Sequence, residues 1–148
     1  MDWAPHVTVA AIIEREGKFL LVDEVVNRTR VLNQPAGHLD EGETLIDAVI
    51  RETLEETAWH FRPCALVGVY RWRQPGGGQT FLRVAFSGEV SSHDSGRELD
   101  TGIIKSVWMT PSQLASEKHR LRSPMVLRCV EDYRFGARYS LSILSDIV

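Results

Sequence analysis

Hydrophobic residues, many of them β-branched, occur along the chain in short runs that polar turns separate. Residues 6–14 and 18–23 are rich in Val, Ile and Leu, and Glu16-Gly17 offers a turn between them, which predicts two strands joined as a hairpin. Polar residues dominate segments 27–32 and 91–102, which we interpret as connections. Three further strands are predicted at residues 65–73, 80–90 and 103–109.

A helical period begins after Thr44, a residue suited to cap a helix N-terminus, with Asp47 three positions later. At about 100° per residue, one stripe of this helix collects side chains that are expected to face a core. These are Ile46, Val49, Ile50 and Thr53. The pattern predicts an amphipathic helix that packs on the predicted strands.

Two more helices are indicated by a capping residue followed by proline. Thr110-Pro111 opens a short helix, and Ser123-Pro124 opens a longer one that is expected to end near Gly136. The glycine-rich segment 75–78 lacks the strand-to-helix context and the Lys-Ser/Thr pair of a phosphate-binding loop, so we interpret it as a hairpin tip. The interleaved strands and helices predict a mixed α/β sandwich.

The composition is that of an ordinary globular protein, with 43% hydrophobic and 25% charged residues. A length of 148 residues suits one domain, which we place at 1–148. The net charge of −3 argues against a nucleic-acid polymer as partner, and no apolar run approaches the roughly 20 residues of a membrane span. Cys64 and Cys129 have no metal or redox spacing, and no secretory signal precedes residue 6, so a cytoplasmic location is expected. No oligomeric state follows from these patterns.

Three carboxylates occupy a second stripe of the first helix. Glu52, Glu55 and Glu56 are spaced so that they are neighbours on the helix surface, where they repel one another. A divalent cation removes this repulsion, and ligation by oxygen atoms alone suits Mg²⁺, with Mn²⁺ as a substitute. The alternative is a glutamate-rich helix face that is merely solvated.

The spacing around these carboxylates resembles the Nudix box, the signature of Nudix pyrophosphohydrolases. The matching positions are Gly37, Glu43, Arg51, Glu52, Glu55 and Glu56. Thr53 stands where the family usually has an aliphatic residue, and Ala58 stands where it usually has the glycine that ends the helix. Because alanine is less suited than glycine to a positive φ, we expect the helix to end differently here.

This resemblance implies a Nudix α/β/α sandwich with a mixed sheet and a loop-helix-loop catalytic motif. It also implies metal ligation by Glu52, Glu55 and Glu56, together with the carbonyl group of Gly37. Arg51 is then expected to pair with a carboxylate and orient the ligating glutamates, because residues that hydrogen-bond to metal ligands often fix the direction of those ligands.

The resemblance leaves the general base open between a box glutamate and a carboxylate in a later loop. Glu52, Glu55 and Glu98 are the candidates, and solvated carboxylates are the commoner interpretation for the loop that holds Glu98. Glu43 is expected to support the loop-helix-loop.

Arg83 is the arginine that we select as a substrate contact, because a planar guanidinium suits phosphate. His38 is a second substrate-binding candidate, although a structural hydrogen bond is the commoner role of such a histidine. Tyr70, Trp72 and Phe81 can stack on a pyrimidine or another base, but aromatic residues in strands more often belong to a core.

Segments outside the box resemble one bacterial branch of the family, the phosphatase-type enzymes that act on hydroxymethylpyrimidine pyrophosphate, thiamine pyrophosphate and nucleoside di- and triphosphates. These segments are residues 6–10, 16–20, 33–39 and 121–124. The expected function is therefore Mg²⁺-dependent hydrolysis of a phosphoanhydride in such compounds, with release of orthophosphate. One alternative is a nucleoside triphosphate pyrophosphatase that gives monophosphate and pyrophosphate. Another is a non-catalytic Nudix-fold module that binds nucleotides or regulates a partner, but such a module has no need of the complete glutamate set.

Overall fold

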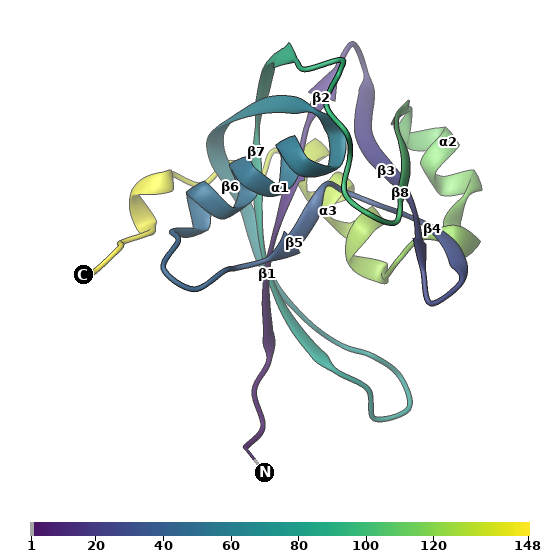
Figure 1. Ribbon diagram of the computed structural model, residues 1–148. Helices are drawn as coiled ribbons and strands as arrows, with labels where there is room; N and C mark the ends of the chain where they lie inside the picture. The colour runs from purple at the N-terminus through teal and green to yellow at the C-terminus, as the bar shows by residue number, and fades with distance from the viewer. Residues whose placement is uncertain (1) are drawn as a thin grey trace.

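The computed structural model describes residues 2–148, in which two sheets and several helices are packed together (Figure 1). One sheet has the strand order β5-β1-β7-β6, and the other has β2, β3 and β4 in order, with β8 paired to β3. The strands are β1 (His6–Ile12), β2 (Glu14–Arg15), β3 (Lys18–Val26), β4 (Thr29–Asn33), β5 (Ala36–His38), β6 (Trp59–Arg73), β7 (Thr80–His93) and β8 (Ile103–Met109). The helices are α1 (Leu45–Thr57), α2 (Pro111–Ser116) and α3 (Pro124–Arg134), and short 3-10 turns cover Lys118–Arg120 and Leu141–Ile143.

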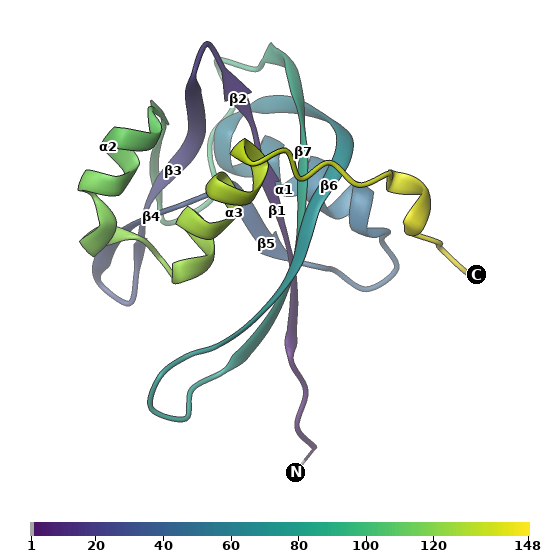
Figure 2. The same cartoon turned by 180° about the vertical axis from the view of Figure 1, so that it is seen from behind.

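The first sheet is mixed, because β1 runs parallel to β7 while β5 and β6 pair antiparallel to their neighbours. Alternate residues of a strand point to opposite faces, and here each face packs on a different helix. Val9 and Val84 pack with Val49 of α1, whereas Ala85 packs with Val126 of α3. Figures 1 and 2 show α1 and α3 on opposite sides of the sheet. The expected α/β/α sandwich with a mixed sheet is confirmed.

The second sheet corrects the prediction for residues 27–32, because residues 29–32 lie in strand β4 and only Asn27 and Arg28 form a connection. β4 pairs antiparallel with β3 in a hairpin whose turn residues, Asn27 and Arg28, both have positive φ values of 49° and 66°. This left-handed conformation suits a two-residue turn between twisted strands. The turn has no glycine, so the usual sequence signal for a hairpin is missing.

The hairpin of β6 and β7 is longer than predicted, because β6 begins at Trp59 and β7 continues to His93. The pairing passes through several register shifts, and at the one between Leu66 and Gly68 the alternation of side chains is interrupted, because Leu66 and Val67 are both buried. The far end of the hairpin extends beyond the body of the molecule in Figure 1. Its tip contains Gly76 and Gly77, both with positive φ, as expected for the glycine-rich turn.

Helix α1 begins as predicted, since the hydroxyl oxygen of Thr44 accepts a hydrogen bond of 3.0 Å from the backbone N–H of Asp47. The expectation for its C-terminus was wrong. Ala58 adopts the left-handed conformation, with φ 63° and ψ 11°, and its N–H donates to the carbonyl of Leu54. Alanine therefore takes the conformation that glycine usually supplies, held by the surrounding packing of a nearly fully buried residue.

The two later helices also begin at their predicted caps. Thr110 and Gln113 form a reciprocal capping box on α2, and the hydroxyl of Ser123 accepts from the N–H of Met125 at the start of α3. Within residues 2–148, no helix combines the length and the apolar character needed to cross a bilayer.

Candidate active site

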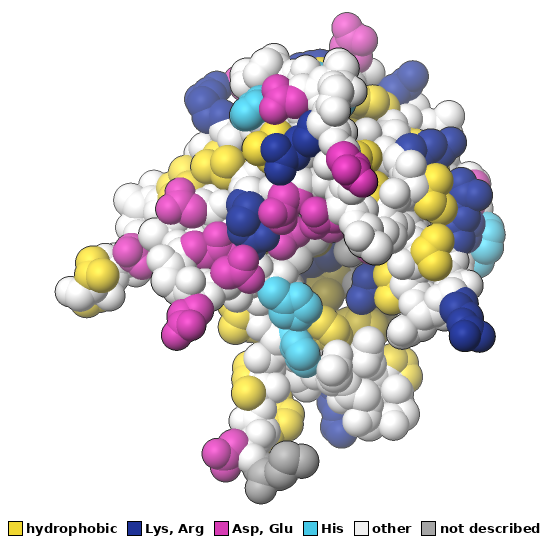
Figure 3. Space-filling view, in the orientation of Figure 1, with side chains coloured by type: hydrophobic (Ala, Val, Ile, Leu, Met, Phe, Trp, Pro, Cys, Tyr) yellow, Lys and Arg dark blue, Asp and Glu magenta, His cyan; other side chains and the backbone are white. Residues whose placement is uncertain are grey.

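Three carboxylates from two segments meet at the surface of α1. Ligand oxygens of Glu52 and Glu55, on the helix, and of Asp100, in the loop after β7, all lie within 4.8 Å of one another. The backbone N–H of Asp100 donates to the carbonyl of Glu55 over 3.0 Å, which attaches the loop to the helix. Figure 3 shows acidic side chains gathered on this face, around a basic side chain and next to histidine. Hard oxygen ligands in this arrangement suit a divalent cation.

Asp100 is the member of this group that the sequence did not single out. The neighbouring Glu98 was a candidate base, but the group of carboxylates includes Asp100 and not Glu98, whose side chain is exposed. Both residues belong to the same acidic loop. The backbone hydrogen bond from Asp100 to Glu55 holds Asp100 against α1.

Glu56 lies deeper than the other two helix carboxylates. Its side chain accepts a 2.9 Å hydrogen bond from the N–H of Ala36, and the residue is 8% exposed. Burial raises the pKa of Glu56 well above its usual range, and burial also raises the pKa of Glu52. A bound cation counteracts this cost of burying negative charge.

Gly37 and Glu52 are in direct contact. A Cβ atom placed on Gly37 lies only 2.1 Å from Cδ of Glu52, so no side chain fits between the strand β5 and this carboxylate. The absence of a side chain is therefore what lets Glu52 rest on the backbone of β5. Together with the paired carboxylates, this close approach fits the metal site expected from the sequence.

Arg51 connects the box carboxylates to one another. Its guanidinium donates to Glu43 over 2.6 and 3.0 Å, and its Nη1 donates to Glu52 and Glu55 over 2.8 and 2.9 Å. Its Nη2 also donates to the carbonyl of His38 over 3.1 Å. The carboxylates hold the pKa of Arg51 above its usual range, and Arg51 lowers the pKa of Glu43. The pairing expected of Arg51 and the supporting position expected of Glu43 are both present.

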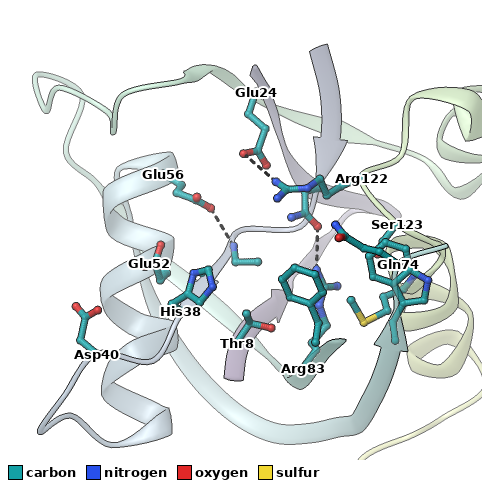
Figure 4. Close-up of a pocket in the computed structure, with 16 residues that line it drawn as sticks. Thr8, Glu24, His38, Asp40, Glu52, Glu56, Gln74, Arg83, Arg122 and Ser123 are labelled. Atoms are coloured by element: carbon teal, nitrogen blue, oxygen red, sulfur yellow. Dashed lines mark hydrogen bonds and ion pairs between the residues drawn. The ribbon is translucent and has the colours of Figure 1, made fainter. Parts of the chain in front are cut away.

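Next to the carboxylates lies a cavity of about 420 Å³. In Figure 4, Glu52, Glu56 and Asp40 stand at one end of the cavity, and Arg83, Gln74 and Ser123 stand at the other. Its lining therefore changes from acidic to neutral or basic. The remaining lining residues are Thr8, Glu24, Asn33, Ala36, Gly37, His38, Trp72, Phe81, Arg122 and Met125.

His38 lines the cavity between these two ends. Its Nε2 lies 3.1 Å from Nδ1 of His6, so the two rings share one hydrogen bond. Burial, and then the neighbouring His6, lower the pKa of His38, which favours a neutral ring. The structural hydrogen bond considered for this histidine is present, and the side chain also remains beside the cavity.

Arg83 is buried at the floor of the cavity, with 3% of its surface exposed. Its Nη1 donates to Oε1 of Gln34 over 2.7 Å, and its Nη2 donates to Oδ1 of Asn33 over 2.9 Å. Its Nε has no hydrogen-bond partner among residues 2–148. The sequence placed Arg83 on a strand beside a cleft, but it did not reveal this depth or these partners.

Among the charged residues of the cavity that carried no individual prediction, two lie close together. Glu24 of β3 and Arg122, which precedes the cap of α3, approach to 3.8 Å. Burial raises the pKa of Glu24, and Arg122 acts in the opposite direction. Arg122 belongs to the segment 121–124 that resembled the family, whereas Glu24 follows the end of the predicted strand and had no signal of its own.

Comparison with known proteins agrees with this geometry. A family model described as NUDIX domain matches residues 4–129. The chain is 37% identical over 142 residues to the Escherichia coli (strain K12) protein named Phosphatase NudJ, an alignment that covers 96% of this chain and 92% of that protein. It is 46% identical to a NUDIX hydrolase from Nitrosomonas europaea, with a TM-score of 0.95 and coverage of 97% and 98% of the two chains. The NUDIX domain of Shewanella oneidensis NrtR, solved with ADP ribose, shares the fold, with a TM-score of 0.69 and 19% identity. That alignment covers 89% of this chain and 88% of the NrtR domain chain.

Proposed function

This chain belongs to the Nudix family of hydrolases, and we propose that it hydrolyses a phosphoanhydride bond in small organic pyrophosphates with Mg²⁺, releasing orthophosphate. The substrates in this proposal are pyrimidine and thiamine pyrophosphates and nucleoside di- and triphosphates. The observation that carries it is the intact group of carboxylates beside a cavity large enough for such a molecule. The similarity to a protein named as a phosphatase favours release of orthophosphate.

We propose that Glu52, Glu55 and Glu56 hold the metal with the carbonyl of Gly37, and that Asp100 completes this set. When bound, Mg²⁺ supplies Lewis-acid polarisation of the phosphoryl oxygens, and Mn²⁺ is expected to replace it. The divalent metal that Nudix enzymes generally use is consistent with these oxygen ligands.

The protein residues divide into two tasks. Arg51 positions Glu52 and Glu55 by direct hydrogen bonds, so that their oxygens stay directed to one point. We assign the general base to Glu52 or Glu55 rather than to Glu98, because these two side chains border the site. A base has to lie within hydrogen-bond reach of the attacking water.

The substrate side is formed by the cavity beyond these carboxylates. We propose that His38 and Arg83 contact the substrate, His38 close to the acidic end and Arg83 at the floor. A small-molecule ligand is part of this proposal, because residues of α1, of the start of α3 and of the β6–β7 hairpin line one cavity of about 420 Å³. The cytoplasmic location and the single domain over residues 1–148 stay predictions.

The test is to incubate the purified protein with Mg²⁺ and a panel of pyrophosphate compounds, and to measure orthophosphate and pyrophosphate separately. Orthophosphate from thiamine pyrophosphate, hydroxymethylpyrimidine pyrophosphate and nucleotides supports the proposal. Pyrophosphate from nucleoside triphosphates supports the pyrophosphatase alternative instead. If neither product forms with Mg²⁺ or Mn²⁺, the enzyme proposal fails and a nucleotide-binding module becomes the better explanation.

A further inference from the structure

Arg83 has hydrogen-bond donors that the protein does not use. Its Nη1 donates to Gln34 and, over 3.8 Å, to Sγ of Cys129, and its Nη2 donates once to Asn33. Among residues 2–148, the N–H of Nε has no hydrogen-bond partner, and Nη2 uses only one of its two N–H groups. A buried donor without a partner is destabilising, because it has lost its hydrogen bonds to water and gained none, so a ligand that supplies acceptors here offsets that loss.

Arg83 also lacks a carboxylate partner, although it is the most deeply buried arginine of the described chain. Arg30, Arg51 and Arg120 each lie within 3.1 Å of an acidic oxygen, whereas no ion pair is recorded for Arg83 among residues 2–148. Its three partners are neutral groups. A buried cation without a counter-charge favours a ligand atom that carries negative charge or partial negative charge.

The guanidinium is held in a fixed orientation by a chain of hydrogen bonds. The amide nitrogen of Gln34 donates to the carbonyl of Val126 over 2.7 Å, which leaves the amide oxygen of Gln34 to accept from Arg83. Val126 belongs to α3, so the orientation is fixed by the packing of that helix on the sheet. The orientation of the unused donors of Arg83 is therefore fixed before any ligand binds.

Aromatic side chains stand next to Arg83 on the same face of the sheet. In register, Phe81 lies between His6 and Trp72, and Phe81 stacks on both rings, with centroid distances of 5.2 and 5.9 Å. Phe81 precedes Arg83 by two residues, so their side chains share a face about 7 Å apart along the strand. Trp72, Phe81 and Arg83 all line the cavity, which gives it an aromatic wall beside a donor-rich floor.

The phosphate groups of the proposed substrate belong at the other end of the cavity. Glu52 and Glu56 lie there, and the proposed metal brings phosphate to them (Figure 4). Arg122, which is more exposed than Arg83 and lies close to Glu24, is better placed for a solvated phosphate. The end at Arg83 is then left for the organic part of the substrate.

Resting on the proposed function, we propose that, among the nucleoside di- and triphosphates of that proposal, Arg83 favours those whose planar ring offers two neighbouring acceptors, as the O6 and N7 atoms of a 6-oxopurine do. A guanidinium only donates hydrogen bonds. A carbonyl oxygen, which accepts them, is therefore favoured at this position, and an amino group, which donates, is disfavoured. Arginine forms paired hydrogen bonds with O6 and N7 of guanine, whereas adenine has a donor in place of O6. Seating the ring requires a small shift of the cavity wall, because Nε is closed to solvent in the free protein.

The experiment measures calorimetric binding of inosine monophosphate and adenosine monophosphate to the full chain in EDTA, where no hydrolysis takes place. The two ligands differ at the purine 6-position, so phosphate contacts cancel in their ratio. We expect inosine monophosphate to bind at least about fivefold more tightly, and its 7-deaza analogue to lose most of that advantage. These comparisons use the wild-type protein and do not depend on the folding of a variant.

Variants then test Arg83 itself. Arg83→Met and Arg83→Lys are expected to remove the preference between the two nucleotides, since methionine has no donor and lysine has no planar fork. Arg71→Met is the matched control: Arg71 is an exposed arginine of the same sheet, and its strand position pairs with Leu82, on the face opposite to Arg83. Thermal melting identifies any variant that does not fold, and such a variant is left out of the comparison.

Equal binding of the two nucleotides by the wild-type protein contradicts the proposal, and so does the absence of binding by inosine monophosphate. A preference that persists in a folded Arg83→Met protein contradicts the assignment to Arg83. Because binding is measured without turnover, selective binding by a protein that releases no phosphate counts against the proposed hydrolysis alone. Hydrolysis without this selectivity counts against the role of Arg83 alone.

Discussion

Arg51 and Glu55 are joined by a hydrogen bond of 2.9 Å between positions four residues apart on α1. The same Nη1 atom lies 2.8 Å from Glu52, so one cation holds two of the proposed metal ligands. The second nitrogen of the fork is occupied by Glu43. This arrangement concentrates negative charge at one point while preventing the carboxylates from moving apart.

Replacing Arg51 by lysine is expected to lower metal affinity by about 10–100-fold, because a point charge cannot bind Glu43, Glu52 and Glu55 at once. The measurement is the Mn²⁺ dissociation constant by calorimetry, followed by the Mg²⁺ dependence of turnover. Arg62→Lys serves as the control, since Arg62 forms an exposed ion pair with Glu89 away from the cavity. An unchanged metal affinity in Arg51→Lys contradicts the positioning role.

Glu56→Gln is expected to retain the fold but lose most metal-dependent turnover. Glutamine keeps an oxygen that can accept from the N–H of Ala36, and it removes the cost of burying a charge, so the melting temperature should not fall. Melting and turnover are measured on the same preparation, at saturating Mg²⁺. Wild-type turnover in this variant rules out Glu56 as a metal ligand.

Gly37→Ala is expected to reduce turnover strongly, because the new methyl group overlaps the carboxylate of Glu52 and has to displace it. The comparison variant is Gly96→Ala, whose added methyl group meets no atom within 4 Å and whose φ is not positive. Turnover per folded molecule, with the folded fraction taken from circular dichroism, distinguishes the two. Equal activity of both variants shows that the position of Glu52 is not critical.

Asp23→Asn is expected to destabilise the protein by roughly 1–3 kcal/mol at neutral pH, because the buried carboxylate accepts charged hydrogen bonds from Arg30 and Arg120. The hydrogen bond from Arg30 is the main cause that lowers the pKa of Asp23 in the folded state. Its stabilisation is therefore complete above the unfolded pKa of about 4 and is lost as the pH falls through the lower folded pKa.

Urea unfolding of the wild-type protein and Asp23→Asn at neutral and acidic pH tests this prediction. The difference in free energy of unfolding between the two proteins should shrink below about pH 4. Because other carboxylates titrate equally in both proteins, the difference isolates Asp23. A difference that does not change with pH means that the carboxylate is not responsible for the stability.

Features set by neighbouring residues were predictable from the sequence. The glutamates of α1 share a face because helix geometry places positions three and four apart together. The caps of α1, α2 and α3 were predictable for the same reason, since a cap bonds the backbone only two or three residues away. The family resemblance then related this local pattern to pyrophosphate chemistry.

Two local signals were misread because packing overrides propensity. Asn27-Arg28 forms a tight turn without glycine, and Ala58 takes a left-handed conformation that alanine disfavours. In both places neighbouring strands or the helix end impose the backbone conformation. Sequence propensity measures the cost of that conformation but not the contacts that offset it.

The sequence by itself determined the helix of carboxylates, the position of most of the longer strands along the chain and the class of chemistry, but not the pairing of the strands, since the segment 6–12 joins a different sheet from the segment 18–23 with which a hairpin was expected. Only the tertiary structure decided that Asp100 rather than Glu98 joins those carboxylates, and that Arg83 is buried under the cavity with unused donors. Each of these facts depends on contacts between segments far apart in the chain, such as Arg83 with Gln34 and Asp100 with Glu55. Periodicity describes the surroundings of a residue within a few positions, whereas these contacts arise from how the sheets and helices pack.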